Sequence, residues 1–403
     1  MHTDERLHAL DTVRGTALLL GLVLHATMSF FLPVPVFDSQ QSTMLAVVFF
    51  VIHIFRMSTF YFIAGFFARL VIERKGVNAF VKDRAKRIGI PMLVGWVILA
   101  PMVIGIIIWA AISTYGVEAV QAQNQGFQGV PLVHIWFLYY LSIFYILAVG
   151  LGWLFNRVVD RAGALRRRAD ALTGALMRTG AAPLLLALPA CIWLYYDESW
   201  SLWGGITTPD TGLTPQPTAL IAFGTAFGFG WLVERRMELL IYCQKYWMLY
   251  LVFAVALIVY CLSLVPLKPS LVPAAEGAGR PGLGWDRFSY AAAYCMATWG
   301  WTFAIVGAAI RYCSDFSAWR RYLADASYWL YLVHLPIVFL MQFLVAGWSI
   351  HWAFKLALIL GVTLGLGLLS YHYMVRFTFI GAILNGRRRE RTPKLGPRTA
   401  AAE

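Results

Sequence analysis

L-D-T-V-R-G-T-A-L-L-L-G-L-V-L-H, from Leu10 to His25, is the first long apolar segment of the chain. Asp11 and Arg14 stand at its beginning, and a histidine lies deep within its apolar part. A helix rises about 1.5 Å per residue, so Asp11 and His25 share nearly one face but lie ~21 Å apart along the axis. Since an ionisable side chain inside a membrane is costly, His25 is expected to face the interior of a helix bundle and to serve a function.

Composition extends this prediction to the whole chain. Hydrophobic residues make up 60% of the 403 positions, charged residues 13%, and the mean hydropathy is +0.67. A soluble domain carries about 25% charged residues. The sequence therefore predicts an all-α, polytopic bundle of about ten membrane-spanning helices. Their expected ranges are 15–32, 45–69, 89–112, 132–155, 182–196, 218–233, 246–266, 288–310, 327–346 and 351–375.

Basic residues lie almost entirely on one side of this predicted bundle. When the N-terminus is placed in the cytoplasm, the outside loops receive only Lys268, Arg280 and Arg287 of the 33 basic residues. The positive-inside rule then predicts that both termini are cytoplasmic. Basic edges beside anionic lipid account for the net charge of +13, so membrane lipid is an expected partner and nucleic acid is not.

One transmembrane domain is expected over residues 1–380, followed by a basic tail. The tail, 381–403, contains the run Arg387-Arg388-Arg389 and is expected to be disordered in the cytoplasm. The five cysteines are scattered without C-x-x-C spacing, so neither a disulfide framework nor a metal site is predicted.

His53 and Arg56 repeat, in the second apolar segment, the pattern set by His25. His25 lies ~12 Å from the outer end of the first span, and His53 and Arg56 lie ~13 Å and ~18 Å below the same surface. A short connection favours adjacent helices, which would bring the three groups to one depth. These three residues either form hydrogen bonds that hold the helices together or form a functional site. The free-energy cost of an unpaired arginine inside a membrane favours a functional site.

A second group of polar residues lies at the cytoplasmic end. Arg84 and Arg87 are three residues apart on one helical face, a fork that suits phosphate or carboxylate. Spacing alone favours the plainer interpretation, an anchor to lipid headgroups. Asp11 lies too far from His25 to orient it and is predicted to form an ion pair with Arg14.

Weaker signals lie in the later spans. His134 and Trp136 begin the fourth span near the outside, and His334 lies within the ninth. Several tryptophans lie near the expected outer boundary, where an aromatic belt is the favoured interpretation. They are Trp200, Trp203, Trp285, Trp348 and Trp352.

Four motifs, taken together, resemble the membrane-bound acyltransferase family 3. They occur in the family's order, and the resemblance runs from about residue 7 to 345. One departure is Ala64, where the family usually has a serine, so a hydroxyl there is dispensable or substrate handling differs. The motifs are L-D-x-x-R-G (Leu10–Gly15) followed by His25, F-Y-F-I-A-G-F-F (Phe60–Phe67), R-x-x-R-I-x-x-P (Arg84–Pro91) and S-Y-x-x-Y-L-x-H-x-P (Ser327–Pro336).

Within that family the chain is most similar to the branch that succinylates osmoregulated periplasmic glucans. One feature that favours this branch is the lack of a fused extracytoplasmic domain. The sequence signs are H-x-x-R-M (His53–Met57), R-x-G-I-P-M-L (Arg87–Leu93) and H-x-W-F-L (His134–Leu138).

The resemblance implies a membrane O-acyltransferase of the bacterial inner membrane. It implies that acyl-CoA, with succinyl-CoA the expected donor, docks from the cytoplasm with its phosphates on Arg84 and Arg87 and with Arg14 as a further candidate. The thioester then reaches Arg56, and either Arg56 or Arg87 would bind the free carboxylate of a succinyl group. His25 serves as general base on a hydroxyl of a periplasmic glucan or carries the acyl group transiently.

His53 is expected to belong with His25 and Arg56 to the catalytic group. His53 or a backbone carbonyl sets the tautomer of His25. Asp11, His134, Trp136 and His334 support the site. No permanently bound cofactor and no metal are expected.

Two alternatives stay open. The acyl group and acceptor could be acetyl and another surface polysaccharide. A transporter of polar solutes could instead use the histidine and arginine cluster as a proton relay. Against transport, the sequence lacks paired Gly- or Pro-broken spans in corresponding halves.

Overall fold

Every regular element of the computed structural model is a helix, as predicted, over the residues it describes: 3–32, 40–123, 130–197, 200–206, 212–265 and 284–386. The α-helices are α1 (Thr3–Thr27), α2 (Thr43–Lys75), α3 (Val77–Arg84), α4 (Ile90–Tyr115), α5 (Val117–Gln123), α6 (Trp136–Leu154), α7 (Ala164–Thr179), α8 (Ala182–Tyr196), α9 (Pro217–Glu234), α10 (Leu240–Leu264), α11 (Trp285–Tyr312), α12 (Ala318–Ala346), α13 (Trp352–Ser370) and α14 (Phe379–Leu384). Short 3₁₀ or π turns join some of them: η1 (Met28–Phe30), η2 (Ala85–Gly89), η3 (Val133–Ile135), η4 (Phe155–Val159), η5 (Met237–Leu239) and η6 (Tyr371–Val375).

The number of spans is slightly smaller than the sequence predicted. Among the described residues, eight helices are long and apolar enough to cross a membrane, and a ninth results if α7 and α8, bent by 111° at their junction, count as one. The difference from about ten lies in α9, whose three glycines, two threonines and Glu234 lower its mean hydropathy. The chain is a multi-pass membrane protein.

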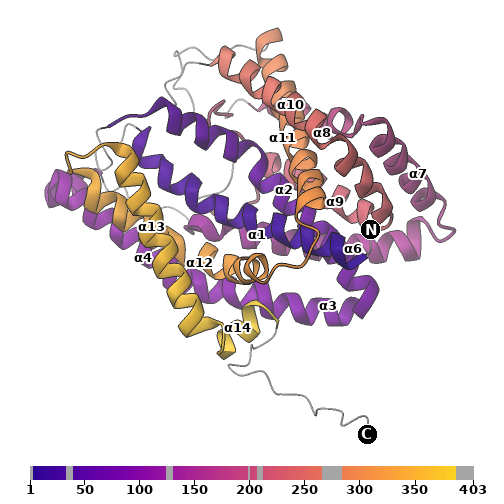
Figure 1. Ribbon diagram of the computed structural model, residues 1–403, viewed down its shortest axis with the longest axis horizontal. Coiled ribbons are helices and arrows are strands. Elements are labelled where there is room, and N and C mark those ends of the chain that lie inside the picture. Colours follow the sequence, from indigo (N-terminus) through magenta and orange to yellow (C-terminus); the bar gives the residue numbers. More distant parts are fainter. Residues whose placement is uncertain are drawn as a thin grey trace, which may run out of the picture.

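Burial divides the helices into an inner and an outer set. Helices α2 and α11 are the most buried, and α1 packs against α2, α11 and α12. Figure 1 shows α1 and α2 side by side in the middle, with α4, α12 and α13 on one flank and α10, α11 and α8 on the other. Helices α4, α10 and α13 expose long apolar faces, which suits contact with lipid tails.

Helices α2 and α9 cross so closely that their backbones touch at two glycines. A Cβ added at Gly65 would collide with the carbonyl oxygen of Phe227, and one added at Gly230 would collide with the carbonyl oxygen of Phe62. Small residues allow this approach, which is a common source of stability between membrane helices. The contact holds α2, the helix that carries Arg56, against α9.

Gly230→Ala is therefore expected to destabilise the protein by about 1–3 kcal/mol, because the added methyl group forces the two backbones apart. Gly228→Ala is the matched control, since Gly228 lies on the same helix and a Cβ added there has no neighbouring atom within 4 Å. Thermal unfolding of the purified proteins measures the difference. Equal melting temperatures for the two variants would contradict the close crossing.

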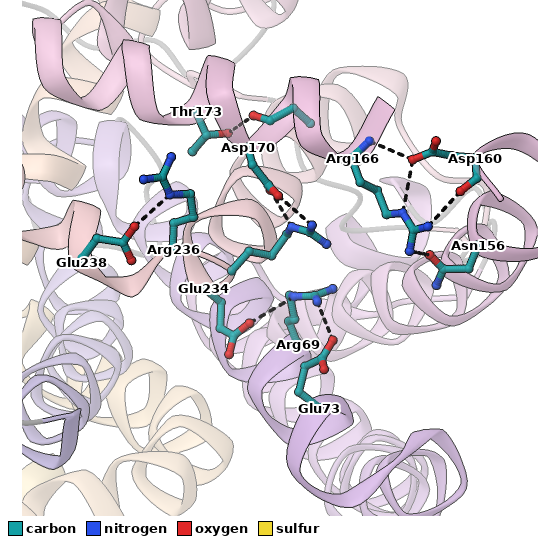
Figure 2. A network of polar contacts seen from close by, with 12 residues as sticks. Arg69, Glu73, Asn156, Asp160, Arg166, Asp170, Thr173, Glu234, Arg236 and Glu238 are labelled. Carbon is teal, nitrogen blue, oxygen red and sulfur yellow. Dashed lines mark hydrogen bonds and ion pairs between the residues drawn. The ribbon is translucent and has the colours of Figure 1, made fainter. Parts of the chain in front are cut away.

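Ion pairs tie the helices together at one end of the bundle, which we call the basic end and define by Arg14, Arg69, Arg84, Arg87 and Arg235. In Figure 2, Arg69 lies between Glu73 and Glu234. Arg235 donates from Nε and Nη2 to the carboxylate of Asp170 on α7 at 2.5 and 2.7 Å. These hydrogen bonds raise the pKa of the Arg235 guanidinium above its ordinary value, although burial opposes them. Helix α7 is thereby fixed to the ends of α2 and α9.

Candidate active site

A cavity with about 200 Å³ of free space opens between α1, α2, α3, η2, α6 and α12 at the basic end. Arg14, Arg84 and Arg87, the three arginines that the sequence suggested for donor binding, all line it. Leu384 of α14 and Asn385 close one side, so the first residues of the expected tail are part of the folded domain. Residues 387–403, the rest of that tail, lie outside the described residues.

A short π-helical turn, η2, begins directly after Arg84 and contains Arg87, and both side chains line the cavity. Such turns often mark functional sites. Pro91 has no N–H to offer the carbonyl oxygen of Arg87. That oxygen accepts a hydrogen bond from Tyr328 Oη instead, at 2.8 Å. The π turn, Pro91 and Tyr328 therefore fix the position of Arg87.

Arg14 lies opposite on α1 and forms the predicted ion pair with Asp11, at 3.0 Å. Asp11 also pairs with Arg321 of α12 at 3.0 Å, a partner that the sequence did not suggest. The Arg14 guanidinium stacks over the ring of Phe67 with 5.6 Å to its centroid. Ala64 lines the same cavity. Arg14 thus has a neutralising partner, yet still faces the space between the helices.

A second, smaller cavity lies deeper in the bundle and has about 20 Å³ of free space, room for about one water molecule. His25, Arg56, His134 and His334 line it, together with Trp136 and Tyr331. Both cavities share the side chains of Leu18, Phe60 and Phe137. We call these three apolar side chains the partition. The two cavities are therefore neighbours on a single path from the basic end into the bundle.

Arg56 reaches the small cavity by crossing the face of α1 at a glycine. A Cβ added at Gly21 would collide with Nη1 of Arg56, so glycine leaves room for the guanidinium in its present position. The side chain is buried, and its Nε has no hydrogen-bond partner. No carboxylate of the described residues lies within ion-pair distance of it. A buried cation without a partner is costly, and an anionic or carbonyl group of a substrate would relieve that cost.

His25 lies at the end of α1, where backbone carbonyls lack partners further along the helix. Gln342 of α12 supplies the missing donor, since its Nε2 donates to the carbonyls of His25 at 2.8 Å and Ala26 at 3.2 Å. Nδ1 of His25 is buried, and among the described residues it has no hydrogen-bond partner. Helix α12 therefore fixes the backbone at His25 and leaves Nδ1 unbonded.

His334 lies between His25 and His134. Its ring centroid is 5.3 Å from that of His25 and 5.4 Å from that of His134. His334 comes from α12, and His134 comes from η3, immediately before α6. The sequence suggested both residues, and Trp136, only as supporting groups. All three line the small cavity.

His53 does not line either cavity, although the sequence placed it with His25 and Arg56. Its ring stacks on Phe49 at 5.3 Å, and a Cβ on Gly205 would lie 2.9 Å from its Nδ1. The difference follows from side-chain length. Arg56 extends across α1 to the cavity, whereas the short imidazole three residues earlier stays beneath the loop at Gly205.

Two tryptophans of the loop that contains Gly205 do not belong to the aromatic belt that the sequence predicted at the outer membrane boundary. Trp200 and Trp203 are only 6% and 4% exposed, because they pack into the core against Tyr290 and Phe50. Trp285, 75% exposed, is where a belt residue should be. Period and composition cannot distinguish a buried loop tryptophan from one at the membrane boundary.

Gly21 and Tyr331 are site residues that the sequence analysis did not single out. Tyr331 belongs to the motif that ends in Pro336 and lies one helical turn before His334, a spacing that puts both on one face. Gly21 carries no comparable signal, because glycine is frequent in membrane helices.

The chain matches one family model and several curated proteins. The acyltransferase 3 family model, described as an acyltransferase domain, matches residues 7–372. Curated relatives include the glucans biosynthesis protein C of Escherichia coli strains K12, SMS-3-5 / SECEC and O1:K1 / APEC. Each is 28% identical over 163 residues, 38% of this chain and 40% of the relative, so the chain spans about two fifths of those relatives' length. No solved structure matches. Because the family model covers most of the chain, the chain belongs to the acyltransferase 3 family.

Proposed function

We propose that the protein transfers a succinyl group from cytoplasmic succinyl-CoA to hydroxyl groups of a periplasmic glucan, across the bacterial inner membrane. The pair of adjoining cavities carries this proposal. One is lined by three arginines, the other by three histidines and an arginine, and Leu18, Phe60 and Phe137 line both. A long donor with a phosphorylated end and a reactive end matches this arrangement.

The basic end is assigned to the cytoplasm, because it holds the arginines that the positive-inside rule places there. The phosphates of the donor bind Arg84, Arg87 and Arg14, whose guanidinium groups suit phosphate oxygens. The pantetheine arm passes the partition and brings the thioester to His25. The coenzyme leaves after each turnover, so the donor is a co-substrate and no cofactor stays bound.

Arg56 supports the choice of succinyl within this scheme. Its buried guanidinium has no carboxylate partner among the described residues, and a succinyl group carries a free carboxylate in addition to its thioester. An acetyl group has no such carboxylate. The relatives named glucans biosynthesis protein C support the glucan as acceptor. His25 acts there as general base on the hydroxyl or as transient acyl carrier.

Mass spectrometry of periplasmic glucans from cells with and without the gene tests this function. Deletion is expected to remove the mass of the succinyl substituents, and the wild-type gene is expected to restore it. Glucans of unchanged mass would refute the glucan as acceptor. Acetyl groups lost from another surface polysaccharide would replace the succinyl assignment.

Arg84→Ala and Arg87→Ala are expected to raise the KM for succinyl-CoA roughly 10–100-fold while changing kcat little. Each removes about 1.5–3 kcal/mol of charge-assisted hydrogen bonding that the bound donor keeps throughout the reaction. Steady-state kinetics on protein in lipid nanodiscs measure both constants. Arg74→Ala is the control, since Arg74 is exposed at the same end and lines neither cavity. An effect on protein abundance alone would return the two arginines to the role of lipid anchors.

A further inference from the structure

The tautomer of His334 is fixed by the backbone of its own helix. Nδ1 of His334 lies 2.6 Å from the carbonyl oxygen of Tyr331. A carbonyl oxygen only accepts, so Nδ1 carries the proton and Nε2 carries the lone pair. Nε2 is buried, and it has no hydrogen-bond partner among the residues described. His334 is 1% exposed and lines the small cavity, so an unoccupied basic nitrogen is enclosed there.

His134 is held by a carbonyl that a proline leaves free. Pro336 has no N–H to donate to the carbonyl of Leu332, four residues earlier in α12. Nε2 of His134 donates to that oxygen at 2.9 Å. Tyr331 Oη in turn donates to the backbone oxygen of His134 at 2.5 Å. The two bonds join the start of α6 to the middle of α12.

The backbone beside His134 is strained. Val133 has φ = 48°, a left-handed conformation that a β-branched residue rarely adopts. Strain of this kind persists only where the surroundings enforce it, and it concentrates at functional sites. The bonds to α12 provide that enforcement, so the position of His134 against His334 is maintained at a cost in backbone energy.

From these contacts we propose that His334 is the base of the transfer reaction and that His134 is a positioning residue for it. The proposal rests on the proposed function, because it concerns the chemistry of the same cavity. His334 is preferred over His134 as base because its ring lies between His25 and His134, in contact with both.

The acyl transfer needs no reactant besides the donor and the acceptor. The hydroxyl oxygen of the acceptor attacks the acyl carbon, and a carbon–oxygen bond forms as the bond to the acyl carrier breaks. That carrier is the thioester sulfur, or a nitrogen of His25 if His25 is acylated. The hydroxyl proton moves to Nε2 of His334 and then to the carrier atom that has left. Nδ1–H keeps its bond to Tyr331 throughout, which stabilises the transient imidazolium. Of the two roles open to His25, the base on the acceptor thus passes to His334.

Two amide substitutions separate the base from the positioning residue, because each amide imitates one ring nitrogen. His334→Asn places an amide N–H near the position of Nδ1 and keeps the bond to Tyr331, but removes Nε2. His134→Gln places an amide N–H near the position of Nε2 and keeps the bond to Leu332. Each variant is reconstituted in lipid nanodiscs with periplasmic glucan lacking succinyl groups. Release of coenzyme thiol is measured with succinyl-CoA and with acetyl-CoA.

His334→Asn is expected to lower kcat by roughly 10²–10⁴-fold, the usual contribution of a general base, without raising the KM for the donor. His134→Gln is expected to retain most of the wild-type kcat, whereas His134→Ala loses it together with the bond to Leu332. A kcat near the wild-type value in His334→Asn would overturn the proposal. So would an equal loss in His134→Gln, which would make both histidines reacting groups.

Gel filtration of each variant checks folding. If His334→Asn does not fold, His334→Gln replaces it: its amide lies near the position of Nε2 and is not basic, so the same loss of kcat is expected, although the bond to Tyr331 is given up. Failure of the proposed function looks different from failure of this assignment. Wild-type protein that releases thiol from neither donor would refute the proposed transfer to this glucan. Wild-type activity that survives in His334→Asn would refute only His334 as base.

Discussion

Replacing His25 by alanine is expected to reduce acyl transfer by roughly 10²–10⁴-fold while the protein stays folded. The ring lines the small cavity and is the neighbour of both His334 and the partition. With His334 as the base, the role left to His25 is that of transient acyl carrier, which requires a ring nitrogen that alanine lacks. The backbone carbonyl that Gln342 binds remains in the variant, so α1 and α12 keep their contact.

Glucan succinylation in cells and thiol release in nanodiscs both measure this effect, with membrane abundance quantified in parallel. His372→Ala is the control, because His372 packs beside Tyr322 and lines neither cavity. A well-expressed His25→Ala protein with normal transfer would remove His25 from the mechanism.

Arg56→Met is expected to reduce kcat/KM for succinyl-CoA roughly 10–100-fold and to reduce it much less for acetyl-CoA. Methionine occupies similar space without charge, so the variant loses the bond to the succinyl carboxylate, worth about 1.5–3 kcal/mol. The same change is expected to leave the melting temperature of the free protein unchanged or higher, because an unpaired buried cation is removed.

Parallel kinetics with the two donors provide the measurement, and each donor is the control for the other. Equal losses with succinyl-CoA and acetyl-CoA would show that Arg56 binds the thioester carbonyl common to both. Arg56→Lys adds a second comparison, because a lysine keeps the charge but not the planar fork. A large fall in melting temperature for Arg56→Met would contradict the absence of a partner.

The sequence predicted the fold well because membrane spans are long and strongly apolar. Eight of the ten expected ranges coincide with helices that can cross a membrane. The exceptions are α8, which forms a bent pair with α7, and α9, which is rich in glycine. One of those glycines, Gly230, allows the backbone contact with α2, a long-range requirement that hydropathy does not register.

The site was predicted in its parts rather than in its arrangement. Spacing and depth brought Arg84 and Arg87 to one face and His25 and Arg56 to one level. The same reasoning placed His53 with His25 and Arg56, whereas the side chains that line the small cavity beside them are His134 and His334. Depth along a helix is a local property, whereas the side chains that meet depend on rotation and on bonds such as that between His134 and Leu332. No periodicity in the sequence encodes those bonds.

A transferase that takes its donor from one side of a membrane and its acceptor from the other endangers the proton-motive force. Protons cross proteins along files of hydrogen-bonded water, and the histidines would readily relay them. Leu18, Phe60 and Phe137 offer water no hydrogen bonds, and hydrophobic constrictions interrupt such files by dewetting. The small cavity beyond them has room for about one water molecule, so the protein without substrate is expected not to conduct protons. On the proposed route the donor parts these three side chains, and proton leakage is expected only while the acyl chain lies between them.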